Sequence, residues 1–139
     1  MSTLARTTDG ERDPIRVLVV DDEAPAAELA EAALERVAEG LDVETATDPA
    51  AALERLADGG YDCLVSDYHM PGIDGLEVCR AARTRRPEVA CVLFTSDGRL
   101  AGPAREAGVG FQEKRGRRGQ FEALAALIQR RVAGKRPRR

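Results

Sequence analysis

Short apolar runs alternate along the chain with stretches that repeat at the helical period. Residues 15–20 (IRVLVV), 61–67 (YDCLVSD) and 89–95 (VACVLFT) are apolar almost throughout, which is typical of strands covered on both faces. Residues 41–47 and 109–113 are weaker candidates for further strands. Repeated strand–helix units predict right-handed crossovers, and therefore an α/β fold with a doubly wound, five-stranded parallel sheet.

Helical patterns fill the segments between these runs. The stronger ones cover residues 26–38, 48–57, 75–85 and 120–133. In the first of them Leu29, Ala33 and Val37 share one face, which we expect to be buried. A weaker pattern after the strand at 89–95 contains Gly102 and Pro103, so we expect a poor helix there.

Length and composition limit the chain to one domain of an ordinary globular class. Its 139 residues are 43% apolar and 32% charged, and no apolar run approaches the roughly 20 residues that span a bilayer. The first residues lack the apolar core of a secretory signal. We expect a cytoplasmic protein without membrane insertion, with a flexible tail at residues 1–14, a domain at 15–133 and a basic tail at 134–139.

The three cysteines, Cys63, Cys79 and Cys91, stand in apolar surroundings. Their spacing fits neither a CxxC pair nor an even disulfide set. We therefore expect free thiols in the core of the domain.

Basic residues gather at the C-terminal end. Residues 114–139 contain ten Lys or Arg and a single acid, Glu122. Such an end attracts phosphate, nucleic acid or an acidic partner, but more often it only aids solubility. Nucleic acid is not expected as a partner, because the segment GKRPRR is too short to fold and has no aromatic side chain for base stacking.

Charged and hydroxyl side chains follow four of the predicted strands. They are Asp21, Asp22 and Glu23 after the first strand, Asp67 after the third, Thr95 and Ser96 after the fourth, and Lys114 after the fifth. The ligand crevice of an open parallel sheet lies beyond the carboxyl ends of its strands. We therefore expect these groups to converge at one edge of the sheet.

The convergence of several carboxylates calls for a compensating positive charge. Two carboxylates repel each other by about 4 kcal/mol at 4 Å and an effective dielectric constant near 20. Mg²⁺ suits such a site, because it binds one or two carboxylates together with waters and a phosphate oxygen. Lys114 adds a compact ammonium group in a chain that has 19 arginines and only two lysines. These groups suit phosphoryl transfer to Asp67 as the nucleophile.

The motifs that carry these residues resemble those of a known family. VLVVDDE, LVSDYHMPGIDG, VLFTS and FQEK are similar, in order and over about residues 15–133, to the response regulator receiver domain of two-component signal transduction. The resemblance implies a flavodoxin-like strand order, 2-1-3-4-5. Because no DNA-binding domain follows residue 133, we expect a stand-alone receiver.

The resemblance implies a phosphorylation site that depends on Mg²⁺. It implies that Asp67 is the phosphoacceptor. It also implies that Asp22, Asp67 and the backbone carbonyl of His69 bind Mg²⁺ directly, whereas Asp21 acts through water.

The resemblance also assigns roles around the phosphoryl group. Thr95 and Lys114 are expected to contact its oxygens, and Thr95 and Phe111 to form the switch that reports its presence. His69 and Asp97 are candidates for tuning the hydrolysis of the acyl phosphate.

The implied function is phosphorelay signalling. A sensor histidine kinase or a histidine phosphotransfer protein would phosphorylate Asp67. The phosphoprotein would then bind an unknown downstream protein in a state-dependent way or pass the phosphoryl group on. It would not be an enzyme in the ordinary sense, because it catalyses only its own phosphorylation and dephosphorylation.

Two features depart from the family pattern. Arg115 stands where members usually have a proline after a cis peptide bond, and because a non-proline cis bond costs about 3–4 kcal/mol we expect a trans bond and a different loop. Thr95 and Lys114 are 19 residues apart, a few fewer than usual. The output surface is therefore expected to differ more than the phosphorylation chemistry.

Two alternatives stay open. An aspartate-nucleophile phosphatase of the haloacid dehalogenase type uses similar groups, but its nucleophile lies in a DxD motif after the first strand, whereas the acidic pair comes first here. Such a phosphatase would also need a cap domain or substrate pocket. A protein-binding module that has lost phosphorylation is the second alternative, and failure to react with acetyl phosphate and Mg²⁺ would favour it.

Overall fold

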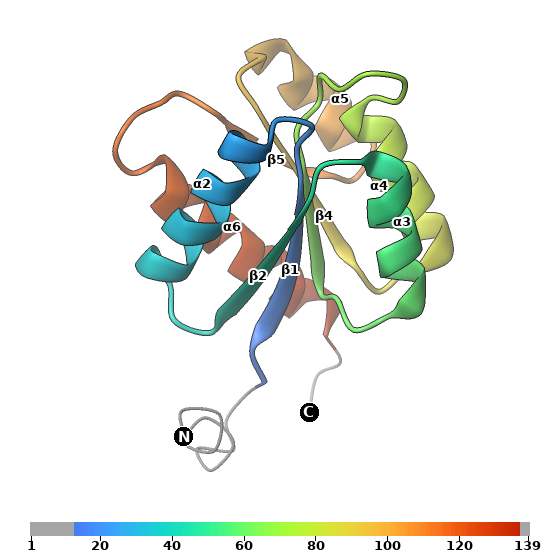
Figure 1. Ribbon diagram of the computed structural model, residues 1–139, viewed down its shortest axis with the longest axis horizontal. Coiled ribbons are helices and arrows are strands. Elements are labelled where there is room, and N and C mark those ends of the chain that lie inside the picture. Colours follow the sequence, from blue (N-terminus) through green and yellow to red (C-terminus); the bar gives the residue numbers. More distant parts are fainter. Residues whose placement is uncertain (1–12, 137–139) are drawn as a thin grey trace.

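The computed structural model describes residues 13–136, and its five strands lie parallel in the order β2-β1-β3-β4-β5 (Figure 1). The strands are β1 Ile15–Val20, β2 Leu41–Ala46, β3 Cys63–Ser66, β4 Ala90–Thr95 and β5 Gly110–Glu113. The helices are α2 Ala24–Val37, α3 Pro49–Asp58, α4 Gly75–Arg85, α5 Ala101–Glu106 and α6 Gln120–Lys135, with a 3₁₀ turn, η1 Gly98–Leu100, before α5. The predicted fold class and strand order are confirmed. Residues 1–12 and 137–139 of the two predicted tails lie outside the described residues, and the domain boundaries stay a prediction.

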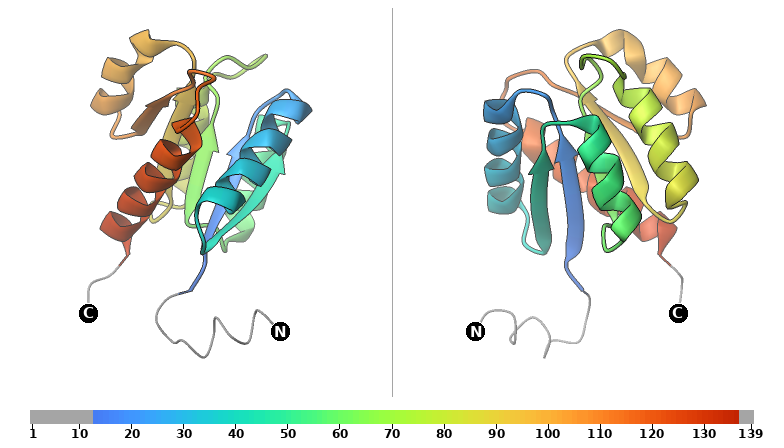
Figure 2. Two further views of the ribbon diagram at one scale, coloured as in Figure 1. Left: turned by 90° about the vertical axis from the view of Figure 1, so that its left-hand side faces the viewer. Right: turned by 45° about the vertical axis from the view of Figure 1, so that its right-hand side comes forward.

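Helices cover both faces of the sheet (Figure 2). Side chains of α3, α4 and α5 pack on one face, and side chains of α2 and α6 pack on the other. Successive strand residues point to opposite faces, so Leu18 joins the first cluster whereas Val17 and Val19 join the second. None of the helices within residues 13–136 has the length and apolarity needed to cross a membrane.

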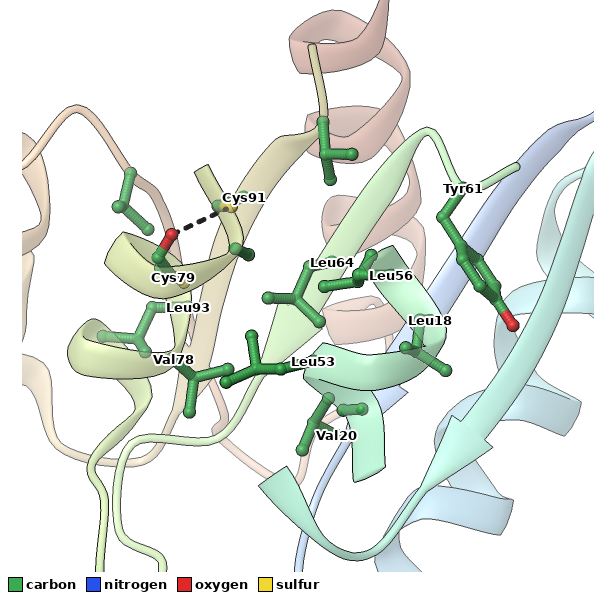
Figure 3. Close-up of a cluster of buried hydrophobic side chains, with 14 of the residues drawn as sticks. Leu18, Val20, Leu53, Leu56, Tyr61, Leu64, Val78, Cys79, Cys91 and Leu93 are labelled. Atoms are coloured by element: carbon green, nitrogen blue, oxygen red, sulfur yellow. Dashed lines mark hydrogen bonds between the residues drawn. The ribbon is translucent and has the colours of Figure 1, made fainter. Parts of the chain in front are cut away.

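The cluster beneath α3 and α4 holds the central strands in place (Figure 3). Leu18, Leu64 and Leu93 come from β1, β3 and β4 and are fully buried. Leu56 of α3 and Val78 of α4 meet them from the helical layer. Burial of one such side chain contributes about 2 kcal/mol. This packing therefore fixes the three strands whose carboxyl ends carry the candidate site.

The three cysteines are buried and free, as predicted. The Cys91 thiol donates a hydrogen bond to the Cys79 carbonyl oxygen at 3.8 Å, inside the cluster of Figure 3. Burial raises the pKa of the Cys63 thiol well above its ordinary value. This thiol therefore stays protonated, and hence unreactive, near neutral pH.

The inward face of α2 differs from the predicted one. Ala27, Ala30 and Leu34 are buried, whereas Leu29 is 60% exposed. The prediction was wrong because it chose the face that carries Leu29 with Ala33 and Val37, whereas the face that carries Leu34 with two alanines is the buried one. Alanine lets a helix approach a sheet closely, and the two alanines and Leu34 recur at the helical period.

The connection between β4 and β5 is short. Pro103 lies in the first turn of α5, where its missing N–H group has no helical partner to lose, so a six-residue helix forms in spite of it. Strand β5 is also short, and it pairs only with the Val92–Thr95 part of β4. The first residues of β4, Ala90 and Cys91, therefore have no neighbour in β5.

Glu44 on β2 is the centre of a charged network. It accepts hydrogen bonds from the Tyr61 hydroxyl, from Arg16 at 2.8 Å and from Arg55 at 2.6 Å. The Tyr61 hydroxyl and then the two guanidinium groups lower the pKa of Glu44 from 4.5 to about 2, against partial desolvation. Because the folded-state pKa is depressed, the ionised carboxylate stabilises the fold above about pH 4.5, and this contribution is lost as the pH falls toward 2.

We expect Glu44→Gln to lower the free energy of unfolding by about 1 kcal/mol at neutral pH. This figure is discounted for solvent screening, since 38% of the side chain is exposed. In urea unfolding, the difference between parent and variant should shrink below about pH 4.5 and vanish near pH 2. The control is Glu54→Gln, an exposed residue of α3, which should change stability by less than about 0.5 kcal/mol. A Glu44→Gln deficit that did not vary with pH would contradict the expectation.

Candidate functional site

Sheet-like hydrogen bonds continue past the ends of the strands and position the predicted site residues. The Asp21 N–H donates to Ala46 O at 3.1 Å, and the Asp67 N–H donates to Val20 O at 3.1 Å. On the other side, the Lys114 N–H donates to Thr95 O at 2.7 Å. The groups that follow β1, β3, β4 and β5 are therefore brought to the carboxyl edge of the sheet, as the topology predicts.

Three carboxylates gather at this edge. Asp21, Asp22 and Asp67 each offer an oxygen atom, and these atoms lie within 4.8 Å of one another. The Lys114 Nζ atom is 3.2 Å from Asp21 Oδ2 and 3.8 Å from Asp67 Oδ2. It also lies 5.3 Å from the centre of the Phe94 ring. Three formal negative charges thus meet one ammonium group.

This arrangement fits a hard divalent cation. Asp22 is exposed and has no ion-pair partner in the part of the chain that the structure describes. The two formal negative charges that Lys114 leaves uncompensated match the charge of a divalent ion. Oxygen ligands are those that Mg²⁺ prefers. Asp21, Asp22 and Asp67 could therefore hold Mg²⁺ at this site.

The Asp67 carboxylate is oriented toward the site and not toward the core. Its Oδ1 atom accepts a hydrogen bond from the Tyr68 N–H at 2.7 Å, and its Oδ2 atom faces Lys114. The side chain is 19% exposed, so a reactant can reach it from solvent. An aspartate held in this way can act as a nucleophile beside a positive charge.

Gly75 allows the loop after Asp67 to close tightly. The Gly75 N–H donates to Tyr68 O at 2.9 Å, and a Cβ atom at Gly75 would lie 2.2 Å from the Asp67 carbonyl oxygen. Asp74 and Glu77 form a capping box that starts α4 at this point. The helix is therefore anchored directly behind the candidate phosphoacceptor.

Thr95 and Phe111 lie on the neighbouring strands β4 and β5. Thr95 is buried, and its hydroxyl oxygen accepts a hydrogen bond from the Asp97 N–H at 3.3 Å. Phe111 is half-buried against the cluster beneath α3–α5 and stands opposite Leu93 in the strand register. Their role as a switch stays a prediction.

His69, two residues after Asp67, and Asp97, two residues after Thr95, contact each other. His69 Nε2 lies 3.2 Å from Asp97 Oδ2, and the imidazole is 63% exposed. Arg99 binds both oxygens of Asp97, with Nε and Nη2 each 2.9 Å away. These hydrogen bonds from Arg99, followed by that from His69, hold the pKa of Asp97 below its ordinary value. Arg99 was missed from the sequence, where only its spacing from Asp97 could have indicated it.

The loop after Lys114 is built without a cis peptide. All peptide bonds in residues 13–136 are trans, which confirms the prediction for Arg115. The Gln120 side-chain oxygen accepts from the Arg115 N–H at 2.8 Å and from the Gly116 N–H at 3.0 Å. A proline at 115 would lack the first of these donors. Gln120 thus holds the loop here, and no sequence motif indicated that role.

Comparison with known proteins agrees with this geometry. A sequence model described as the response regulator receiver domain matches residues 17–113. Transcriptional regulatory protein TcrA of Mycobacterium tuberculosis is 38% identical over 92 residues, which make up 63% of this chain and 36% of TcrA. Transcriptional regulatory protein TrcR of the same organism is 41% identical over 83 residues, or 60% of this chain and 32% of TrcR. The match thus spans about a third of the length of these relatives.

Solved structures share the fold. A response regulator receiver domain protein from Clostridium thermocellum has a TM-score of 0.76 at 24% identity, covering 87% of this chain and 96% of its own. Response regulator protein TrrA from Thermotoga maritima, in complex with Mg(2+)-BeF, has a TM-score of 0.71 at 29% identity. The similarity covers 82% of this chain and 98% of the TrrA chain. Both similarities extend over most of this chain, not over a single motif.

Proposed function

The chain belongs to the response regulator receiver domains of two-component systems, and on that premise we propose that it accepts a phosphoryl group on Asp67. The observation that carries the proposal is the position of the Asp67 carboxylate, which is partly exposed and close to two other acids and to Lys114. A donor can reach this carboxylate, and a positive charge lies beside it.

The proposed chemistry is the transfer of a phosphoryl group from a histidine nitrogen to an aspartate oxygen. An Asp67 carboxylate oxygen attacks the phosphorus of a phosphohistidine, the new P–O bond forms as the P–N bond breaks, and the released imidazole nitrogen takes up a proton. Lys114 places its ammonium group beside the transferred oxygens, and the Thr95 hydroxyl donates a hydrogen bond to one of them. In hydrolysis, water attacks the same phosphorus, the P–O bond to Asp67 breaks, inorganic phosphate leaves and the carboxylate is regained.

A bound Mg²⁺ would neutralise the charge on the phosphoryl oxygens. Asp22, Asp67 and the His69 carbonyl would bind it directly, and Asp21 through water. Two observations support this assignment: the three converging carboxylates of this chain, and the Mg(2+)-BeF complex of the Thermotoga maritima relative.

Signalling would follow from a shift between two conformations. Receiver domains take their phosphoryl group from histidine kinases, and the relatives TcrA and TrcR are transcriptional regulatory proteins. When Thr95 moves toward the phosphoryl group, the packing next to β5 changes and Phe111 repacks. A downstream protein would recognise that state, or a phosphotransfer protein would accept the group. A cytoplasmic location stays a prediction.

Phosphorylation by a small donor tests this proposal. With acetyl phosphate and Mg²⁺ the protein should gain one phosphoryl group, located on Asp67 by peptide mass spectrometry. Chelation of Mg²⁺ with EDTA should slow uptake by at least about tenfold, because the carboxylates would then face the phosphoryl oxygens unscreened. No uptake from acetyl phosphate or from a phosphorylated phosphotransfer protein would favour a phosphorylation-independent binding module. Repeated turnover of a phosphate monoester would favour the phosphatase alternative.

His69 and Asp97 are proposed to set the lifetime of the phosphoryl group. They contact each other two residues after Asp67 and two residues after Thr95, and Arg99 holds the carboxylate in place. We expect His69→Ala and Asp97→Ala to lengthen the lifetime by about threefold to tenfold, less than the loss of a full general base would cause. Decay of protein labelled with ³²P measures this lifetime. Asp58→Ala, at the far end of α3, is the control, and lifetimes equal to the parent's in both site variants would reject the role.

A further inference from the structure

A cationic groove lies at the edge of the sheet where the strands begin, opposite the carboxyl edge. We call this edge the foot of the sheet. It has a volume of about 750 Å³ and opens between α4, α5 and the end of α6. Arg80 and Arg83 of α4 and Lys135 of α6 line it together with Pro87, which precedes β4. Since Asp67 lies beyond the opposite ends of the strands, this groove is separate from the proposed phosphorylation site.

The short β4–β5 connection explains why the groove exists. Six residues of α helix rise about 9 Å, whereas six residues of strand cover about 20 Å. Strand β5 therefore leaves the first two residues of β4, Ala90 and Cys91, without a partner strand on that side, and α4 extends further toward the foot of the sheet than α5 (Figure 2). The segment between Thr95 and Lys114 is a few residues shorter than is usual in the family, and we infer that this shortening leaves the groove open.

The Arg83 and Lys135 side chains of this groove are hydrogen-bonded to backbone carbonyl groups and not to carboxylates. Arg83 donates to the Ala107 carbonyl oxygen, and Lys135 Nζ donates to Pro87 O at 3.0 Å. Throughout residues 13–136, neither of these side chains nor Arg80 lies within 4.0 Å of a carboxylate oxygen. No ion pair therefore neutralises these three side chains, and the groove lining holds three cationic side chains and one carboxylate, that of Glu106. Arg83 and Lys135 are already anchored, which lowers the entropic cost of binding an anion.

The chemistry of the groove favours a compact phosphorylated ligand. Arginine forks and an ammonium group are the usual donors to phosphate oxygens. The volume falls within the range of small-molecule sites, roughly 300–1,000 Å³. Pro87 and Pro103 offer apolar surface for a ring, and Glu106 on the α5 side can accept a hydrogen bond from an amine or hydroxyl group.

We propose that this groove binds a phosphorylated small molecule of nucleotide size. Its phosphate contacts Arg80, Arg83 and Lys135, and its ring lies against Pro87 and Pro103. The site is independent of the chemistry at Asp67. A ligand there would touch α4 and α5, which precede and follow β4 in the chain.

The test is a titration of the ¹⁵N-labelled protein with AMP and GMP in the presence of EDTA. Backbone amides of Arg83, Ala107 and Lys135 should shift, with a Kd below about 1 mM, whereas the amides of Asp67 and Lys114 should not. Inorganic phosphate should bind at least about tenfold more weakly, because it cannot use the proline surface. Equal affinity for phosphate and nucleotides would overturn the proposal that the ligand is of nucleotide size.

Charge-reversal variants show whether the groove itself is responsible. Arg80→Glu and Lys135→Glu, both at exposed positions, should weaken binding at least about tenfold while the spectrum stays that of a folded protein. Arg85→Glu and Arg130→Glu make the same charge change at exposed positions of α4 and α6 outside the groove, and should change the Kd by less than about twofold. Equal losses in all four variants, no nucleotide-dependent shifts, or binding of duplex DNA without binding of mononucleotides would each overturn the proposal.

Discussion

An Asp67→Asn variant is expected to take up no measurable phosphoryl group from acetyl phosphate and Mg²⁺. Asparagine has nearly the same shape, but its amide oxygen is a poor nucleophile and carries no formal charge for a cation. We expect the rate of uptake to fall at least about a hundredfold, or about 2.7 kcal/mol in the barrier. Mass spectrometry of the intact protein measures the loss.

The fold of Asp67→Asn should survive, since the variant removes one of three mutually repelling charges. Urea unfolding without Mg²⁺ should therefore give a stability equal to the parent's or higher. Asp42→Asn makes the same chemical change at an exposed residue of β2 and should be phosphorylated at the parental rate. Undiminished uptake by Asp67→Asn would refute Asp67 as the phosphoacceptor.

A Gly75→Ala variant is expected to lose about 1–3 kcal/mol of unfolding free energy through overpacking. The added Cβ atom would lie 2.2 Å from the Asp67 carbonyl oxygen and 2.8 Å from Leu93 Cδ1. Neither neighbour can retreat easily, because Asp67 is held by its bond to Val20 and Leu93 is fully buried. Urea unfolding gives the stability, and acetyl phosphate uptake should fall with it as the Asp67 backbone is displaced.

Gly102→Ala makes the same substitution where space is open. No atom lies within 4 Å of a Cβ atom built at Gly102, which is inside α5. Alanine is the better helix former, so this variant should gain about 0.5–1 kcal/mol. The two substitutions should thus change stability in opposite directions. A Gly75→Ala protein as stable as the parent would show that the α4 start is not rigidly packed behind Asp67.

Local pattern predicted much of the fold and the site. The apolar runs indicated the buried strands, and the polar residues directly after these runs indicated Asp21, Asp67, Thr95 and Lys114. The topology rule then placed these groups at one edge, and the structure brings the three acids and Lys114 together there. Such signals are readable because strand burial and strand-end chemistry depend on residues that are adjacent in the chain.

The sequence by itself determined the parallel α/β architecture, the buried cysteines, and the acidic residues and lysine at the carboxyl edge of the sheet. Each of these follows from periodicity or from residue type. Only the tertiary structure decided that Leu29 points outward, that Gln120 holds the loop after Lys114, and that a cationic groove opens below α5. These outcomes depend on distances between segments that are remote along the chain. Hydrophobic pattern specifies that a helix packs, but the shapes of its neighbours decide which side chains meet and where space is left.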